Sequence, residues 1–451
     1  MAAREMIEKN SERYLGWLTE ACSIPSLADE ADGLVRMAQW VEDKLRDLGA
    51  TVERLTYQGA PDALLGRLGS GERTLLIYDH YDVQPVDPIE LWNSKPFEPE
   101  IRDGFFFARG AADNKGDLVA RLAALEIYKE IHGELPFTVK FLVEGEEETG
   151  SKSFEAITDQ YADRLGADGC IWEGHGIDHA GRPEFVTGAK GLAYVELSYE
   201  GLNDDQHSSY AVVAPSPVWH LIEALATLRD PDGTVTIDGF YDDVVRPTAE
   251  DEELLKRFPS EENEERDRMG VTEFVGGVTG LDYLKRYFFE PTCNIAGIEA
   301  GFTVPNASKT VLPKKVMAKL DMRLVPEQDP NDIVDKLRKH LDARGFNDIA
   351  IQQYSMEHPV RSPADSLVAK ASLAAAVDIF DQPPAIAPMM IGTGPMWPVA
   401  HKLGIPTVSP AGVHRPTSNI HAPNENCAID DYLTIIDYTV AYLKKFGELD
   451  N

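Results

Sequence analysis

Three short apolar segments, interrupted by one helical segment, constrain the fold of this chain more than any other feature. Thr74–Tyr78, Thr138–Val143 and Gly169–Trp172 are apolar runs of strand length, and Asp117–His132 has the length and spacing of a helix. Runs of this kind are typical of buried strands, and strands that alternate with helices form parallel sheets. The pattern predicts a three-layer α/β domain with a mostly parallel sheet.

The middle of the chain has a different pattern. Ala193–Tyr199 and Lys315–Arg323 alternate apolar with polar residues, as in strands with one exposed face, and Asn331–Arg344 is helical. A strand-helix-strand-strand-helix-strand order with one open sheet face suits a small α+β domain of the ferredoxin-like type. We therefore expect a second domain of a different class from the first.

The helical pattern resumes at Ser366 and ends in a last helix near the C-terminus. This return indicates that the second domain is inserted into the first. We expect one discontinuous domain from residues 1–191 and 362–451, with residues 192–361 forming the insertion.

Composition and charge exclude several classes of function. The 451 residues include 76 acidic and 43 basic side chains, which gives a formal charge of −33. Nucleic acids and anionic membranes repel such a surface, so we expect neither as a partner. No apolar run reaches membrane-spanning length, no leader peptide is visible, and four distant cysteines are typical of free thiols. These features favour a cytoplasmic protein.

Five segments place metal-binding side chains at strand ends or in polar loops. Taken singly, most of them fit a solvated polar loop or a structural histidine as well as a site. Four glutamates within five positions, however, repel one another unless cations or protons neutralise them. Asp82, two residues after the first histidine, could orient its ring. The segments contain His80, Asp113, the glutamates at 144 and 146–148, Glu173 and His421.

Two histidines with carboxylates, and no thiolate, form a mixed nitrogen and oxygen donor set. Such a set suits Zn²⁺, with Co²⁺ or Mn²⁺ as alternatives, better than a structural cysteine-rich site. A carboxylate shared by two ions would hold a bridging water whose pKa the ions lower. A further glutamate could then act as the general base.

These segments, in this order, resemble the co-catalytic metallopeptidase family. That family includes carnosinase-like dipeptidases, acetylornithine deacetylase, succinyl-diaminopimelate desuccinylase, aminoacylase and glutamate carboxypeptidase. The stretch from Trp92–Phe97 through Arg109–Gly110 resembles the family's approach to its bridging aspartate, and the similarity extends over nearly the whole chain. The resemblance implies two divalent ions, most simply zinc.

The resemblance also implies a role for each residue of the set. Glu147 would be the general base, and Asp82 would orient the first histidine. The metal ligands would be His80 and Glu173 for one ion, His421 and Glu148 for the other, and Asp113 as the bridge.

In the inserted domain, the resemblance implies residues that bind the substrate. His207 is similar to the family's lid histidine, which often acts from the partner subunit, and Arg323 to the arginine that holds the substrate carboxylate. Thr393 and Gly394 resemble the loop at the C-terminal end of the substrate. A homodimer is therefore expected. Ser209–Val213 departs from the family's glycine-rich turn after the histidine.

Two features point to different branches of the family. Its dipeptidases usually carry aspartate where Glu173 stands, whereas its carboxypeptidases and deacylases carry glutamate. The long lid, with Asp238–Val244 and Pro291–Ile295, resembles the dipeptidase branch. We predict a dipeptidase that cleaves an amide bond next to a free carboxylate. The alternatives are an N-acyl-amino-acid deacylase, a carboxypeptidase, and a non-catalytic binding protein on the same fold.

Overall fold

The computed structural model describes residues 2–259 and 261–449, and the chain folds into two compact units. The first unit comprises Met1–Gly188, Arg361–Met389 and Gly394–Asn451. The second comprises Ala189–Val360 and Met390–Thr393, so most of it lies between two parts of the first in sequence.

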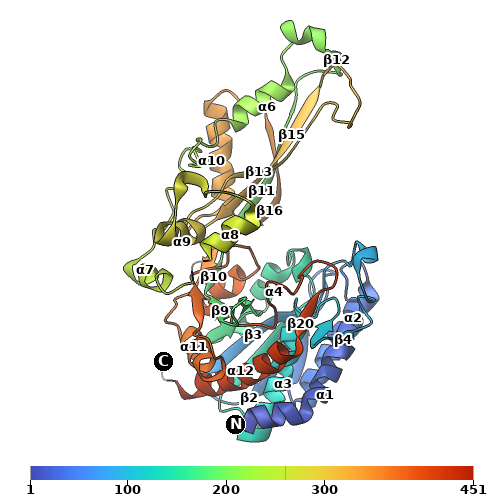
Figure 1. The fold of residues 1–451 in the computed structure, drawn as a ribbon, viewed down its shortest axis with the longest axis vertical. Coiled ribbons are helices and arrows are strands. Elements are labelled where there is room, and N and C mark those ends of the chain that lie inside the picture. Colours follow the sequence, from blue (N-terminus) through green and yellow to red (C-terminus); the bar gives the residue numbers. More distant parts are fainter. Residues whose placement is uncertain (1, 260, 450–451) are drawn as a thin grey trace. The chain divides into compact units, whose positions relative to one another are not determined.

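A six-stranded sheet forms the centre of the first unit (Figure 1). β6 pairs with β3, β3 with β7, and β7 with β19 in parallel, whereas β1 and β2 form an antiparallel edge. The predicted α/β class with a mostly parallel sheet is confirmed. The order is β1 (Thr51–Leu55), β2 (Ala63–Gly69), β6 (Thr138–Glu144), β3 (Thr74–His80), β7 (Gly169–Ile171), β19 (Thr407–Val408).

The three apolar runs become the central strands because their side chains are buried. Every residue of β3 after Thr74 and every residue of β7 is buried. His80 of β3 stands beside Glu144 of β6 in parallel register. The carboxyl ends of these strands therefore meet at one edge of the sheet, where the polar segments follow.

Long helices complete the first unit. The helix α3 is buried over most of its length, and it packs against β3, α1 and α12 (Figure 1). Side chains from these elements belong to one continuous apolar core. The bounds are α1 (Ala2–Cys22), α2 (Ala31–Asp47), α3 (Lys115–His132), α11 (Leu367–Ile379) and α12 (Ile429–Glu448).

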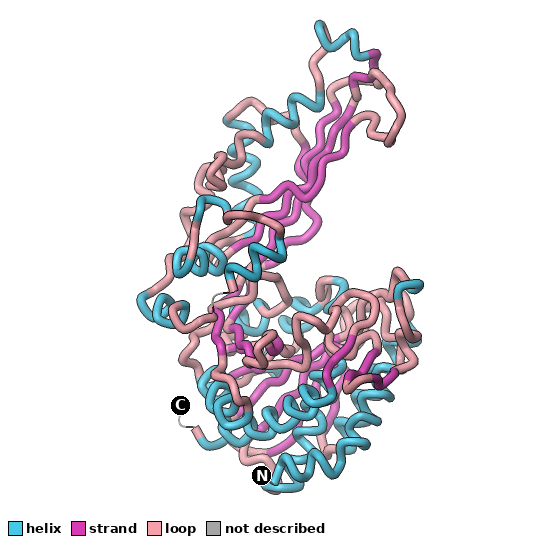
Figure 2. Tube along the Cα trace, in the orientation of Figure 1, coloured by secondary structure: helices cyan, strands magenta, loops and turns pink. Residues whose placement is uncertain are grey.

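The second unit contains a four-stranded antiparallel sheet, which Figure 2 shows as adjacent magenta strands. Its chain order of strand, helix, strand, strand, helix, strand matches the predicted ferredoxin-like unit. The sheet order is β13 (Asn294–Ala300), β15 (Lys315–Leu324), β11 (Gly191–Glu200) and β16 (Ala350–Glu357), with helices α6 (Pro217–Leu225) and α10 (Pro330–Ala343).

Local sequence explains these elements. Alternate residues of β11 are buried, as the sequence pattern predicted, and they pack with α6 and α10 in a second apolar core. The helix α10 begins at Pro330, and the Asp329 carboxylate accepts hydrogen bonds from the backbone N–H groups of Asn331 and Asp332. This unit also contains the short helices α7 (Ala249–Leu255), α8 (Glu262–Met269) and α9 (Gly280–Phe289).

Two further observations bear on the environment of the chain. The described helices include none with both the length and the apolar character that crossing a bilayer requires. All four cysteines are buried and unbridged.

Candidate metal centre

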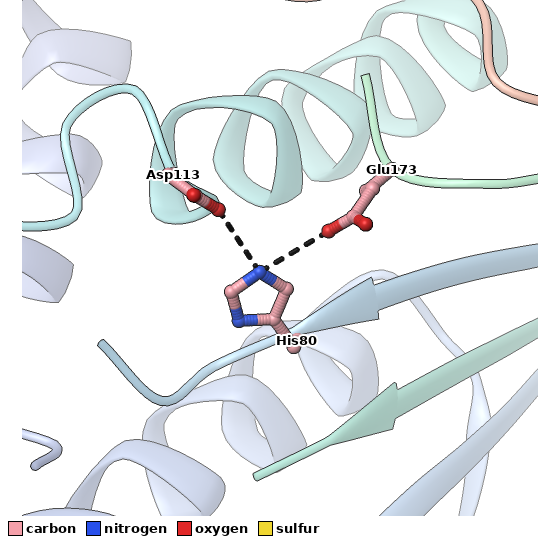
Figure 3. A group of neighbouring side chains, drawn as sticks. All are labelled: His80, Asp113 and Glu173. Carbon is pink, nitrogen blue, oxygen red and sulfur yellow. Dashed lines mark hydrogen bonds and ion pairs between the residues drawn. The ribbon is translucent and has the colours of Figure 1, made fainter. Parts of the chain in front are cut away.

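The first group of potential metal ligands comes from three separate elements. His80 ends β3, Asp113 lies in the loop before α3, and Glu173 follows β7. The Nε2 atom of His80 is 3.1 Å from Oδ1 of Asp113 and 3.2 Å from Oε2 of Glu173 (Figure 3). One imidazole nitrogen and two carboxylates therefore converge on a single point.

A second group shares the same aspartate. Nε2 of His421 lies 3.0 Å from Oδ2 of Asp113 and 3.1 Å from Oε2 of Glu148. Within each group, the possible ligand atoms lie within 4.8 Å of one another. Because its two oxygens point to different histidines, Asp113 has the geometry of a carboxylate that bridges two cations.

The charge of the centre supports this interpretation. Asp113, Glu147, Glu148 and Glu173 gather here, and no lysine or arginine among the described residues pairs with any of them. Burial, followed by the charge of Glu173, raises the pKa of Glu147 well above its usual value. The buried Oε1 of Glu148 has no hydrogen-bond partner. Carboxylates crowded in this way need cations, so the residues fit two divalent metal ions.

The two histidines differ in their surroundings. Burial alone would lower the pKa of His80, but its contacts with Asp113, Asp82 and Glu173 raise it well above the ordinary value. Contacts with Asp113 and Glu148 raise the pKa of His421 to about 10. The His80 side chain is fully buried, whereas that of His421 is 52% exposed. His80 is therefore enclosed by protein, whereas His421 can be reached by solvent.

Asp82 connects the first histidine to the glutamate run. Its Oδ1 atom is 3.3 Å from Nδ1 of His80 and accepts a hydrogen bond of 3.2 Å from the backbone N–H of Glu147. Its Oδ2 atom accepts one of 2.9 Å from the backbone N–H of Glu148. Glu147 and Glu148 begin a 3-10 turn, Glu147–Thr149, shortly after the strand β6. Asp82 therefore holds the two N–H groups with which this turn begins.

A buried network of hydrogen bonds supports the first group of potential ligands. The carboxylate of Asp79 accepts hydrogen bonds from Nδ2 of Asn114 at 3.0 Å and Nη1 of Arg121 at 2.9 Å. Arg121 also donates to the carbonyl oxygens of Tyr78 at 2.8 Å and Trp172 at 2.5 Å. Because Asp79, Asn114 and Trp172 each precede or follow a member of the first group, this network fixes the spacing of that group.

Glu425 supports the loop that carries the shared aspartate. Its side chain is fully buried and forms an ion pair with Nη1 of Arg109. Its two oxygens also accept hydrogen bonds from the backbone N–H groups of Gly110, Ala112 and Asp113, at 3.0, 2.9 and 3.0 Å. One carboxylate from the His421 loop therefore fixes the Asp113 loop.

The remaining predicted site residues belong to the second unit or its border. His207 is exposed, and its Nδ1 atom lies 2.9 Å from Oγ of Ser209. Arg323 donates from Nη1 to Oγ1 of Thr393 at 2.6 Å, and its Nε atom lies 3.5 Å from Oδ1 of Asp321. Arg323 and Thr393 are thus brought together. Gly394 follows Thr393, and a Cβ atom added there would meet no other atom within 4 Å.

The sequence patterns did not single out several residues that the structure places around the centre. Glu425 and Arg109 lie inside segments that were noted for other residues, and a buried charge in a polar loop has no local signal. Glu144, to which we assigned no role, is buried and accepts hydrogen bonds from the hydroxyls of Tyr78 at 2.6 Å and Ser151 at 2.9 Å. Its carboxyl group therefore links the strand β3, through Tyr78, to Ser151.

Two clusters of potential metal ligands that share one aspartate, at the carboxyl edge of a mostly parallel sheet, are typical of a hydrolase with a two-metal centre. The family model that describes peptidase family M20/M25/M40 matches residues 76–445. The chain belongs to this family of metallopeptidases.

Three similar proteins place the chain within the family. A Cys-Gly metallodipeptidase, dug1, of Schizosaccharomyces pombe is 29% identical, over 76% of this chain and 76% of the relative. The Beta-Ala-His dipeptidase of Mus musculus is 30% identical over 72% of this chain and 70% of its own length. The crystal structure of an M20 family metallo-carboxypeptidase, Sso-CP2, from Sulfolobus solfataricus is 39% identical, with a TM-score of 0.89 and coverage of 97% of this chain and 99% of that one.

Proposed function

We propose that this protein is a two-metal dipeptidase, which hydrolyses the peptide bond next to a free C-terminal carboxylate. The observation that carries the proposal is the shared aspartate, whose two oxygens face one histidine each. The dipeptidases among its relatives support the choice of substrate. Zinc is the metal that the mixed donor set favours, with manganese or cobalt as alternatives.

The ligands divide into two sets. His80 and Glu173 would hold one ion, His421 and Glu148 the other, and Asp113 both. When bound, the ions supply positive charge that polarises the substrate carbonyl and makes a water molecule more acidic. Asp82 would keep the His80 ring oriented, since its carboxylate lies beside Nδ1.

Glu147 would be the general base. It lies close to both groups but belongs to neither, so its carboxylate can take a proton from the attacking water and pass it to the leaving nitrogen. The backbone of Glu147 is held by Asp82. The same aspartate therefore positions both a ligand and the base.

In the second unit, Arg323 would bind the substrate carboxylate. Its planar guanidinium group suits a bidentate contact, and Thr393 holds it by a hydrogen bond. His207 would polarise the scissile carbonyl from the partner subunit of a homodimer, and Gly394 would border the C-terminal end of the substrate. The edge strand β13 supports the dimer proposal because Ile295 and Ile298 are 45% and 53% exposed on it.

A second candidate function is a carboxypeptidase acting on longer peptides. The 39% identity to the Sulfolobus metallo-carboxypeptidase favours it, as does the glutamate at position 173. Under either function, the buried, unbridged cysteines support a cytoplasmic location, and the acidic composition argues against nucleic acid or membrane as partners.

A substrate panel distinguishes the two functions. Chelated protein would be resupplied with Zn²⁺, Mn²⁺ or Co²⁺ and given dipeptides, N-acyl amino acids and peptides of four to six residues. Dipeptidase function predicts that dipeptides have the highest kcat/KM. Faster hydrolysis of longer peptides would favour the carboxypeptidase, and full activity in protein shown to contain no metal would refute both.

The adjacent glutamates provide a matched pair of variants. Glu147→Gln is expected to retain both ions and to lose about 10²–10⁴-fold in kcat, the usual contribution of a general base. Glu148→Gln is expected to lose metal, and its activity should partly recover at high metal concentration. Elemental analysis and kinetics of both variants test the assignment, which is wrong if the two results are exchanged.

A further inference from the structure

The second unit contains a pocket whose charge is opposite to that of the chain as a whole. The pocket encloses about 480 Å³. Among the described residues that line it, Glu290 is the one acid, against four cations in a chain of net charge −33. We call it the cationic pocket, after its cations Lys190, Arg229, Arg286 and Arg323.

Two of these cations converge on Gly233. This residue has a φ of +94°, in the left-handed region that favours glycine, within a turn that begins at Asp230. A Cβ atom built on Gly233 would lie 3.1 Å from Nη2 of Arg229 and 3.1 Å from Nη2 of Arg286. The two nitrogens are therefore no farther apart than twice this distance. Guanidinium groups so close repel each other unless an anion lies near both.

The charges of Arg229 and Arg286 are not equally paired with acidic side chains. Nε of Arg286 lies 3.1 Å from Oε2 of Glu290, and the charge of Arg286 contributes to lowering the pKa of Asp232, after the hydrogen bonds from Thr234. Arg229 is different. No acidic side chain of the described residues lies within ion-pair distance of it. Arg229 thus contributes to the wall of the pocket a guanidinium group that forms no ion pair with the described residues.

The other walls are aromatic. Tyr241, Phe274, Tyr283 and Tyr287 line the pocket, and the rings of Phe274 and Tyr283 stack with centroids 4.5 Å apart. A ligand that fills this volume therefore needs an apolar portion as well as an anionic group. The size is that of a small-molecule site and exceeds what a lone inorganic anion requires.

Arg323 connects this pocket to the proposed function. Its backbone N–H donates to Oγ1 of Thr292 at 3.0 Å, and its carbonyl oxygen accepts from the N–H of Thr292 at 2.9 Å. The following residue, Cys293, also lines the pocket and lies near Arg229, whose charge opposes the burial that raises the pKa of this thiol to about 11. The segment Thr292–Cys293 thus lies beside both Arg323 and Arg229.

We propose that the cationic pocket receives the C-terminal residue of the substrate and selects an acidic side chain, which Arg229 and Arg286 bind. The proposal rests on the proposed function, in which Arg323 holds the α-carboxylate of that same residue. A glutamate at this position offers two carboxylates on a short methylene chain, and the pocket offers separate cations for them together with apolar lining residues.

A binding experiment tests the pocket without any hydrolysis. Metal-depleted protein would be titrated calorimetrically with N-acetyl-L-glutamate and with N-acetyl-L-glutamine, which differ by one charge. We expect the glutamate derivative to bind at least about tenfold more tightly, as charge-assisted hydrogen bonds suggest. Arg229→Gln should remove the difference, while Arg257→Gln, at an exposed arginine outside the pocket, should preserve it. Equal affinities in the wild-type protein would overturn the proposal.

Kinetics then separate the pocket from the peptidase function. With metal restored, the wild-type protein should hydrolyse Ala-Glu with a kcat/KM at least about tenfold above that for Ala-Gln. Arg229→Gln should abolish this ratio, while Arg257→Gln should preserve it. Hydrolysis with no preference, or with a preference for Ala-Phe over Ala-Glu, would refute the selection of acidic side chains and leave the proposed peptidase function in place. Selective binding with no hydrolysis of any peptide would support the pocket and refute the proposed function.

Discussion

Replacing Glu425 by glutamine tests whether one buried carboxylate organises the metal centre. The variant keeps the size of the side chain but exchanges one acceptor oxygen for an NH₂ group. In the wild-type protein, one oxygen accepts from Ala112 and Asp113, and the other accepts from Arg109 and Gly110. Whichever way the amide turns, two of the four hydrogen bonds are lost, and the NH₂ group faces two other donors.

The magnitude follows from the burial of the contacts. Each hydrogen bond to a charged group contributes about 1.5–3 kcal/mol. The loss of two such bonds should therefore lower the free energy of unfolding by about 3–6 kcal/mol. This range is consistent with the roughly 3–5 kcal/mol that breaking a buried ion pair costs. A loss of this size is a large fraction of the free energy of unfolding of an ordinary domain, which is about 5–15 kcal/mol. We expect Glu425→Gln to be folded but much less stable.

The assay is urea unfolding of chelated protein, followed by metal titration of the folded state. Glu98→Gln is the matched control because Glu98 forms only a surface pair with Lys95, with both side chains more than half exposed. The control should change the free energy of unfolding by less than about 0.5 kcal/mol. Metal affinity should also fall in Glu425→Gln, since either orientation of the amide removes two of the four hydrogen bonds that hold the loop of Asp113. If Glu425→Gln is as stable as the control and binds metal normally, the carboxylate does not organise the centre.

Two further predictions concern the second unit. Burial lowers the pKa of Lys190 to about 8 from its ordinary 10.5, so between these values the folded state binds fewer protons than the unfolded state. The free energy of unfolding of the wild-type protein, relative to that of Lys190→Met, should therefore rise as pH increases from 8 to 10.5 and fall again as pH drops to 8. The slope should be at most about 1.4 kcal/mol per pH unit. Thermal melts of both proteins across this range test the prediction, and a stability difference that does not change with pH would contradict it. For the homodimer, sedimentation should show two chains per particle, and Ile298→Glu on β13 should yield monomers. A monomeric wild-type protein at micromolar concentration would contradict the dimer.

Much of this protein follows from short-range patterns in its sequence. Buried strands and amphipathic helices are recognised from a few neighbouring residues, because burial of one face imposes a fixed period. The candidate metal ligands could be predicted for the same reason: His80 and Glu173 lie at or just beyond the ends of apolar runs, and parallel strands bring such ends to one edge. The resemblance of the motifs to a known family then indicated roles that no single segment carries.

The supporting contacts could not be predicted in this way. Glu425 is separated from Arg109 by 316 positions, and no periodic pattern relates residues so far apart. Likewise, the 3-10 turn at Glu147–Thr149 depends on Asp82, a carboxylate from a different strand end. The cationic pocket is a further example, since Arg229 and Arg286, which are distant in sequence, both approach the turn at Gly233. The sequence by itself determined the elements and the donor residues, because burial acts on near neighbours; only the tertiary structure decided which charges face one another, because that depends on how distant segments pack.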